Sequence, residues 1–245
     1  MCDARDVEKC PGPGGPTMAR SMKDARAYHQ WVYESFEKWL LRNGATLEIG
    51  AGHGEYSELL LGLDGKLTVT DIDSEAVEIV DRRFAGMDDV TVIRMDGIEP
   101  ERLEMVFENI VALNIMEHIE DDLGFARGMY EVLKPDGRAI VFVPAFPLLY
   151  SEIDAQAGHH RRYTSKGVRE VLENAGFSVI SMRYFNFVGF FGWYLNKLTG
   201  SGVDSEATNF QVKLFNYIVP IVRKLEMFNW LCGQSIIAVA EKKGG

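Results

Sequence analysis

Five short apolar segments, separated by helical patterns, constrain the fold of this chain more than any other feature of its sequence. The apolar segments are 45–49, 67–70, 90–93, 110–113 and 139–143. The helical patterns between them cover 56–63, 74–84 and 121–133. Strands that are apolar over nearly their whole length are typical of a parallel sheet with helices on both faces. The alternation therefore predicts an α/β fold.

Further helices and strands are predicted before and after this alternating region. Apolar and aromatic residues recur at helical spacing over 22–41, which predicts a helix ending near Asn43 and Gly44. A second helix is predicted over 164–175, with Thr164 or Ser165 as its N-cap. Two further strands are predicted at 177–184 and 235–240.

The segment between these last two strands, 185–232, is long for a plain loop and rich in aromatic residues. We expect it to form a helical lid over the carboxyl edge of the sheet, which could also bind substrate. Residues 1–21 are rich in glycine, proline and charge without periodicity, and we expect a flexible tail there. Residues 22–245 are predicted to form a single domain.

A glycine-rich turn follows the first predicted strand directly. Gly50, Gly52 and Gly54 stand in the spacing G-x-G-x-G, and the acidic Glu48 precedes them. Glycine permits positive φ and close approach of the backbone to a ligand, and ligands of open α/β sheets bind at this edge. Dinucleotide enzymes place the third glycine one residue later, so the spacing favours a different nucleotide. Asp71, at the end of the second strand, can accept ribose hydroxyls in either case.

These motifs resemble those of the class I S-adenosylmethionine (AdoMet)-dependent methyltransferases, over about residues 45–145. The resemblance implies nine cofactor-binding residues: Glu48, Gly50, Gly52, Gly54, Asp71, Ile72, Asp96, Gly97 and Asn114. In the family, the residue at Asp71 binds the ribose, and those at Ile72 and Asp96 lie at the adenine. The turn 133–137 resembles the family's L-K-P-G-G, with Asp136 in place of one glycine, a mild departure because aspartate tolerates turn geometry.

The resemblance also implies the architecture and the cofactor. The expected fold is Rossmann-like, with a mostly parallel seven-stranded sheet and helices on both faces. The expected cofactor is AdoMet, and the expected reaction is methyl transfer.

Glu117 and His118 follow the fourth strand, where the family brings cofactor and acceptor together. Histidine titrates near neutral pH, which makes His118 a candidate general base, with Glu117 holding its ring or contacting the acceptor. The alternative is that the pair organises its loop or caps the helix at Asp121.

A second candidate segment lies between the fifth strand and the next helix. With Asp154 before it, the run Gly158–Thr164 resembles a G-H-x-R-R-Y-T loop found in a bacterial subgroup of methyltransferases. The residues in question are His159 and His160, as catalytic candidates, and Arg161, Arg162 and Tyr163, as substrate-binding candidates. Arginines there could grip a carboxylate or phosphate through forked hydrogen bonds. Alternatively, the arginines pair with surface acids and the tyrosine packs in the core.

Methyl transfer is an in-line displacement, so the protein mainly aligns the reactants and excludes water. Because a histidine is available as base, we expect O-methylation of a small or hydrophobic acceptor, which includes lipid-like molecules and peptides. Methylation of a peptide or protein carboxylate, and N- or C-methylation, stay open. Outside this class, the alternatives are an NAD-dependent oxidoreductase and a non-catalytic AdoMet-binding protein.

Composition limits the partners. A formal net charge of −10 argues against a nucleic acid partner. Three cysteines, no apolar signal segment and no charge-free apolar run of spanning length predict a cytoplasmic protein without a transmembrane segment. Peripheral membrane contact through 190–194 is weakly supported, because that segment lacks a basic face.

No carboxylate–histidine grouping has metal-site spacing, so we expect a metal-independent reaction. The oligomeric state is left open.

Overall fold

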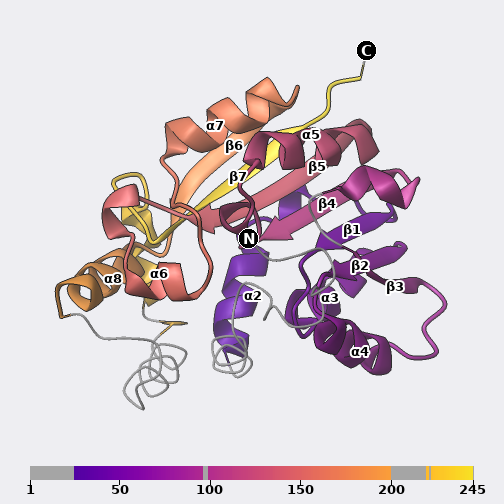
Figure 1. Cartoon of the computed structure of the whole chain (residues 1–245), viewed down its shortest axis with the longest axis horizontal. Helices are drawn as coiled ribbons and strands as arrows, with labels where there is room; N and C mark the ends of the chain where they lie inside the picture. Colours follow the sequence, from indigo (N-terminus) through magenta and orange to yellow (C-terminus); the bar gives the residue numbers. More distant parts are fainter. Residues whose placement is uncertain (1–24, 96–98, 200–218, 221, 245) are drawn as a thin grey trace, which may run out of the picture.

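The computed structural model describes residues 25–95, 99–199, 219–220 and 222–244, and contains one seven-stranded sheet (Figure 1). The strands are β1 (Thr46–Ile49), β2 (Leu67–Asp71), β3 (Val90–Arg94), β4 (Phe107–Leu113), β5 (Leu133–Pro144), β6 (Ser178–Phe185) and β7 (Ser235–Glu241). Their order across the sheet is β3-β2-β1-β4-β5-β7-β6. All neighbours pair in parallel except β7, which is antiparallel to both β5 and β6. The expected Rossmann-like fold is confirmed.

Helices connect the strands. The α-helices are α2 (Arg26–Glu34), α3 (Glu55–Leu60), α4 (Ser74–Arg83), α5 (Asp122–Val132), α6 (Glu152–Gln156), α7 (Ser165–Asn174) and α8 (Phe187–Thr199). Short 3-10 turns are η1 (Glu37–Trp39), η2 (Leu61–Leu63), η3 (Pro100–Leu103), η4 (Met116–His118), η5 (Pro147–Leu149) and η6 (Arg223–Phe228). Thr164 caps α7 as expected, because its hydroxyl accepts from the Gly167 N–H at 3.0 Å.

The sheet separates two apolar cores, one on each face. On one face, α5 and α7 pack through side chains such as Phe125 and Leu172. On the other face, α2, α3 and α4 pack through side chains such as Trp31, Leu60 and Val80. In Figure 1 these two groups of helices lie on opposite sides of the strands. Burial on both faces explains why the central strands are apolar throughout, and it leaves their carboxyl ends to carry polar chemistry.

The structure differs from the predicted elements at two helices. The helix expected over 22–41 ends at Glu34 within the described residues, and a 3-10 turn follows, because the fully buried Phe36 has left helical geometry with φ −131°. Helix α6 was not predicted from the sequence. It starts at a capping box in which Ser151 N–H and Oγ both donate to the Asp154 carboxylate, at 2.9 and 3.1 Å.

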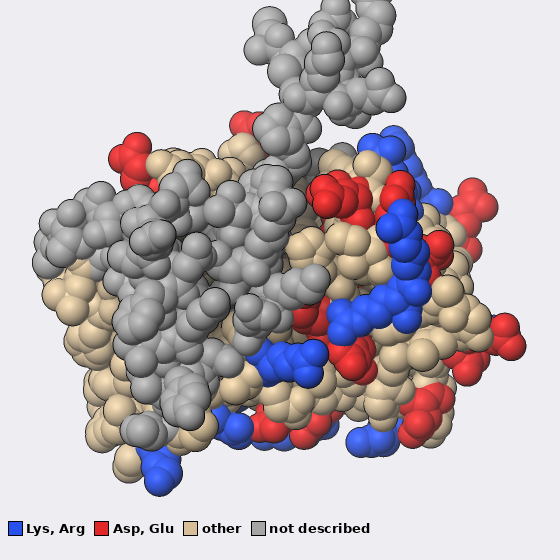
Figure 2. All heavy atoms as spheres, turned by 90° about the horizontal axis from the view of Figure 1, so that it is seen from below, with Lys and Arg blue, Asp and Glu red and all other residues tan. Residues whose placement is uncertain are grey.

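The predicted lid 185–232 is described in part, as α8 and η6, and its role stays a prediction. The predicted tail 1–21 lies outside the described residues. Each helix that the structure describes is too short or too polar to cross a bilayer. On the face drawn in Figure 2, basic and acidic side chains of the described residues are interspersed.

Candidate functional site

The glycine turn after β1 has backbone geometry that only glycine adopts easily. Gly50, Gly52 and Gly54 have φ of +75°, +55° and +82°. A Cβ at Gly50 would stand 1.9 Å from Ile115 Cδ1, so the loop after β4 packs directly on this turn. A Cβ at Gly52 would meet no heavy atom within 4 Å. The turn is thus supported at Gly50 and faces open space at Gly52.

Asp71 closes this space from the end of β2. Its two oxygens accept from the backbone N–H groups of Gly52 and Asp73, at 2.8 and 2.9 Å. Burial raises the pKa of the Asp71 carboxyl, and the two hydrogen bonds oppose that rise. Each oxygen keeps a lone pair that can accept from a ligand. The neighbouring Ile72 side chain is 46% exposed, which leaves an apolar surface beside the carboxylate.

Glu48 supports the turn from beneath. Its side chain is buried, and one carboxylate oxygen accepts from the Ser57 hydroxyl on α3. Burial raises the pKa of Glu48 to about 8, although the bond from Ser57 lowers it. Glu48 therefore joins the strand before the turn to the helix after it.

Of the nine predicted cofactor residues, Asp96 and Gly97 lie outside the described residues.

The loop after β4 carries the next group. Asn114 has a left-handed φ of +57°, and its backbone N–H donates to Phe142 C=O at 2.8 Å. Its side-chain N–H donates to Glu117 Oε1 at 3.0 Å. Glu117 is fully buried, and Oε2 has no hydrogen-bond partner among the described residues. Burial raises the pKa of Glu117 to about 7, against the lowering effect of His159.

The structure brings His118 and His159 together, although they are far apart in the sequence. The two ring centroids are 4.6 Å apart, and the rings are nearly perpendicular. Burial lowers the pKa of His118 to about 4, and His159 adds to this effect, while a backbone hydrogen bond with Gly158 opposes it. His118 Nδ1 is buried and has no partner within the described chain. His118 is therefore neutral at pH 7.

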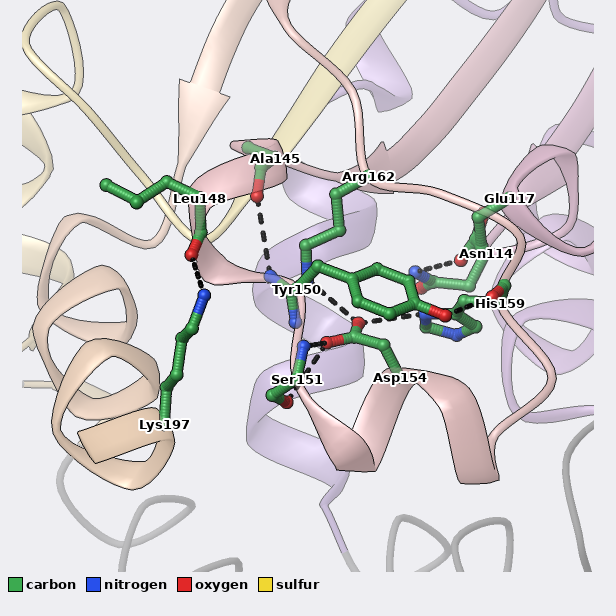
Figure 3. Close-up of polar contacts among 10 residues, drawn as sticks. All are labelled: Asn114, Glu117, Ala145, Leu148, Tyr150, Ser151, Asp154, His159, Arg162 and Lys197. Carbon is green, nitrogen blue, oxygen red and sulfur yellow. Dashed lines mark hydrogen bonds and ion pairs between the residues drawn. The ribbon is translucent and has the colours of Figure 1, made fainter. Parts of the chain in front are cut away.

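Asp154 on α6 organises the far side of this cluster (Figure 3). Its Oδ1 accepts from Arg162 Nε at 2.8 Å and lies 3.0 Å from His159 Nδ1, and its Oδ2 accepts from Ser151. Burial raises the pKa of Asp154, but the bond from His159 and the charge of Arg162 outweigh it and hold the pKa below its usual range. Since an ionised carboxylate only accepts, the hydrogen of a neutral His159 ring is on Nδ1 and the lone pair is on Nε2.

Arg162, the ion-pair partner of Asp154, is also buried and hydrogen-bonded. Its side chain is 2% exposed, and it also donates to Ala145 C=O at 3.4 Å. The guanidinium lies 4.7 Å from the Trp193 ring centre, which connects α8 to the network. The Tyr150 hydroxyl donates to the His159 carbonyl at 2.8 Å and fixes the backbone of the same loop. The contacts of the Arg162 guanidinium are therefore with groups inside the protein.

The remaining predicted residues of the loop have similar internal contacts. Arg161 is partly exposed and donates to the Asp122 carboxylate at 2.9 Å and to Glu120 C=O at 2.8 Å. Tyr163 is buried, with its hydroxyl 2.9 Å from the Asp122 carboxylate. His160 is exposed, and its backbone N–H donates to Glu117 C=O at 2.8 Å. Their substrate-binding and catalytic roles stay predictions.

Sequence reasoning placed Asp154 in a motif but gave it no role, and it missed Trp193 as a partner of Arg162. The spacing of Ser151 and Asp154 is the signature of a capping box and could have revealed α6. No local pattern could have paired Arg162 with Trp193, because that contact depends on where α8 packs.

Known proteins resemble this chain in sequence and in fold. A family model described as "Methyltransferase domain" matches residues 47–139. Among curated proteins, the chain is similar to the mitochondrial ubiquinone biosynthesis O-methyltransferase of Schizosaccharomyces pombe, with 28% identity over 133 residues. The match covers 52% of this chain and 47% of that protein, so the chain spans about half the length of this relative.

Solved structures share the whole fold. One is a Haloferax volcanii methyltransferase in complex with its activator Trm112, with a TM-score of 0.63, 15% identity and 93% coverage of both chains. Another is a SAM-dependent methyltransferase from Archaeoglobus fulgidus, with a TM-score of 0.57, 18% identity, and coverage of 87% of this chain and 94% of that one. The family match over residues 47–139 includes the glycine turn and Asp71, and the chain has the fold of the class I AdoMet-dependent methyltransferases.

Proposed function

We propose that the protein transfers the methyl group of AdoMet to a hydroxyl oxygen of a small or hydrophobic acceptor. The observation that carries this proposal is the contact between the glycine turn and the loop after β4. Ile115 packs on Gly50, and Glu117 and His118 follow Ile115 in the chain. The expected cofactor site and the polar cluster therefore adjoin each other at the carboxyl edge of the sheet.

The residues on the cofactor side fit AdoMet. The open space at Gly52 allows a ligand to approach the backbone, as the positive φ values of the turn require. Asp71 has lone pairs left for two ribose hydroxyls, and exposed Ile72 offers an apolar surface to an adenine ring. Glu48 acts as a positioning residue, because it reaches the turn only through the strand and Ser57.

AdoMet supplies a methyl carbon bound to a positively charged sulfur. The acceptor oxygen forms the new carbon–oxygen bond with its own electron pair while the carbon–sulfur bond breaks and leaves its pair on sulfur. A hydroxyl must also lose its proton, and a group within hydrogen-bond reach has to receive it. Glu117 Oε2 and His118 Nδ1 are unpartnered basic atoms among the described residues, and His159 lies beside them. We assign the proton to this cluster.

Two observations support an oxygen acceptor with apolar character. The curated relative is named as an O-methyltransferase, which supports oxygen over nitrogen or carbon. Helix α8 places aromatic side chains near the site, since Phe190 contacts Phe146 with ring centres 5.2 Å apart, and Trp193 contacts Arg162. Such side chains suit an acceptor with an apolar body. They also support the predicted role of the 185–232 segment in substrate binding.

The test is methyl transfer by the purified protein, followed as S-adenosylhomocysteine by mass spectrometry. Phenols and catechols with apolar substituents are offered alongside matched amines and carboxylic acids. We expect turnover with the hydroxyl acceptors. Glu117→Gln and His118→Ala should each lower the rate about 100-fold or more while AdoMet affinity is retained. Lys166→Ala, on the exposed face of α7, is the control and should keep full activity.

Turnover with amines or carboxylates and none with hydroxyls would overturn the oxygen assignment. A carboxylate acceptor is already ionised, so its methylation should also survive the loss of His118. Binding of NAD in place of AdoMet, measured by calorimetry, would overturn the whole proposal.

A further inference from the structure

Three side chains near the proposed acceptor site form a cluster that can hold a metal ion. One ligand atom each from Glu117, His118 and His159 lies within 4.8 Å of the other two. Glu117 and His118 belong to η4, and His159 comes from the loop after α6. One carboxylate oxygen with two imidazole nitrogens is a donor set used by catalytic zinc and related divalent ions.

In two of these three residues, a buried polar atom lacks a hydrogen-bond partner among the described residues. Glu117 Oε2 and His118 Nδ1 are buried and have no hydrogen-bond partner among the described residues. A buried carboxylate oxygen without a donor is costly, and so is a buried ring nitrogen without a partner. Both are electron-pair donors when the carboxyl is ionised and the ring nitrogen is unprotonated. A single cation between them satisfies both.

The groups behind the cluster match what metal ligands need. A histidine that binds a metal through one nitrogen usually donates its other N–H to a carboxylate or carbonyl. His159 has this arrangement, with Nδ1 3.0 Å from Asp154 and Nε2 left with a lone pair. Asp154 is fixed in turn by Arg162. Glu117 is held through Oε1 by Asn114, so Oε2 stays free to bind.

We propose that Glu117, His118 and His159 bind one divalent transition-metal ion at the acceptor end of the site. Three protein ligands leave a coordination position open, which is typical of catalytic metal sites. A divalent cation there would lower the pKa of an acceptor hydroxyl and stabilise its anion. In that case the cluster holds the cation, and the hydroxyl proton is released to water instead of to the cluster. The proposal departs from the metal-independent reaction expected from the sequence, and its catalytic part rests on the proposed function.

The binding test needs no acceptor. The full chain is stripped with a chelator and titrated with Zn²⁺ by calorimetry, and Co²⁺ is added separately to record its visible absorption. We expect one equivalent of Zn²⁺ to bind and Co²⁺ to give the intense bands of a four- or five-coordinate site. Glu117→Gln, His118→Ala and His159→Ala should each weaken Zn²⁺ binding about 100-fold. The control is His53→Ala, in the glycine turn outside the cluster, which should bind Zn²⁺ like the wild type.

Retained AdoMet affinity and an unchanged circular dichroism spectrum show that a variant is folded. The proposal is wrong if the wild type binds no equivalent of Zn²⁺, or if the folded cluster variants bind it as tightly as His53→Ala does. Its failure is distinguishable from that of the proposed function. Stoichiometric Zn²⁺ binding without methyl transfer would refute only the function. Methyl transfer by a metal-free protein, unchanged by a chelator and by added Zn²⁺, would refute only the metal's role.

Discussion

The two sides of the proposed site are built differently. The cofactor side is made of backbone from one short stretch, the turn that holds Gly50, Gly52 and Gly54, with Asp71 closing it. The acceptor side is made of side chains from three separate segments, held together by buried charges around Asp154. A backbone site is specified by local conformation, whereas a side-chain site depends on how distant elements pack. The first can keep its ligand while the second changes, and this allows one fold to serve many acceptors.

Replacement of Asp154 should have the largest effect and would show whether the two sides are independent. Asp154→Asn leaves the buried Arg162 without its counter-charge, and breaking a buried ion pair in this way costs about 3–5 kcal/mol. We expect urea denaturation to show that loss in the free energy of unfolding, while AdoMet affinity below the transition stays within about twofold of wild type. The matched control is Glu152→Gln, at an exposed position of the same helix. A parallel loss of AdoMet affinity would mean that the two sides are coupled.

Replacement of Gly50 tests the other side. An added Cβ would stand 1.9 Å from Ile115 Cδ1 and would force a side chain into φ +75°. Strain and overpacking together should lower the free energy of unfolding of Gly50→Ala by about 3 kcal/mol. AdoMet binding, measured by calorimetry, should weaken more than tenfold. Gly62→Ala is the control, because a Cβ there meets no atom within 4 Å. Equal behaviour of the two variants would contradict the backbone origin of the cofactor side.

The effect expected at Glu48 is the smallest when taken per pH unit, and it sharpens the role of this carboxyl. Its pKa is about 8 in the folded protein and near 4.5 in the unfolded chain. Between these values the folded state holds a proton that the unfolded state has released, so this carboxyl's contribution to stability is full below pH 4.5 and is lost as pH rises to 8. Glu48→Gln cannot titrate. Its stability relative to wild type should therefore rise with pH, by at most about 1.4 kcal/mol per pH unit.

Urea denaturation at pH 5, 6.5 and 8 measures this difference. Glu78→Gln, on the exposed surface of α4, is the control and should follow wild type across the same range. A pH-independent difference for Glu48→Gln would show that the carboxyl is ionised at every pH tested, despite its burial.

The contrast between the two sides also explains how much could be predicted from the sequence. Alternating apolar segments predicted all seven strands, because a sheet covered on both faces has near-continuous apolar strands. The spacing of Gly50, Gly52 and Gly54 predicted the turn, because only a glycine accepts these φ values without strain.

The acceptor side could be predicted only as a set of residue types. His118 and His159 were both singled out as candidates, but nothing in the sequence indicated that their rings lie 4.6 Å apart. That distance depends on how the segment after β4 packs against the loop after α6. Arg162, a predicted substrate ligand, has its charge paired with Asp154 inside the protein. Local patterns cannot report such pairings, because they depend on packing between elements.

The place of β7 in the sheet has a consequence for synthesis of the chain. Among the described strands, β6 pairs only with β7, and β7 lies between β5 and β6. A ribosome that has made residues 178–185 has therefore produced an edge with no neighbour to join until residues 235–241 emerge. Strands β1 to β5 can assemble as the chain grows, whereas β6 must wait for β7. We therefore expect the nascent chain to expose this half-finished edge to chaperones during translation.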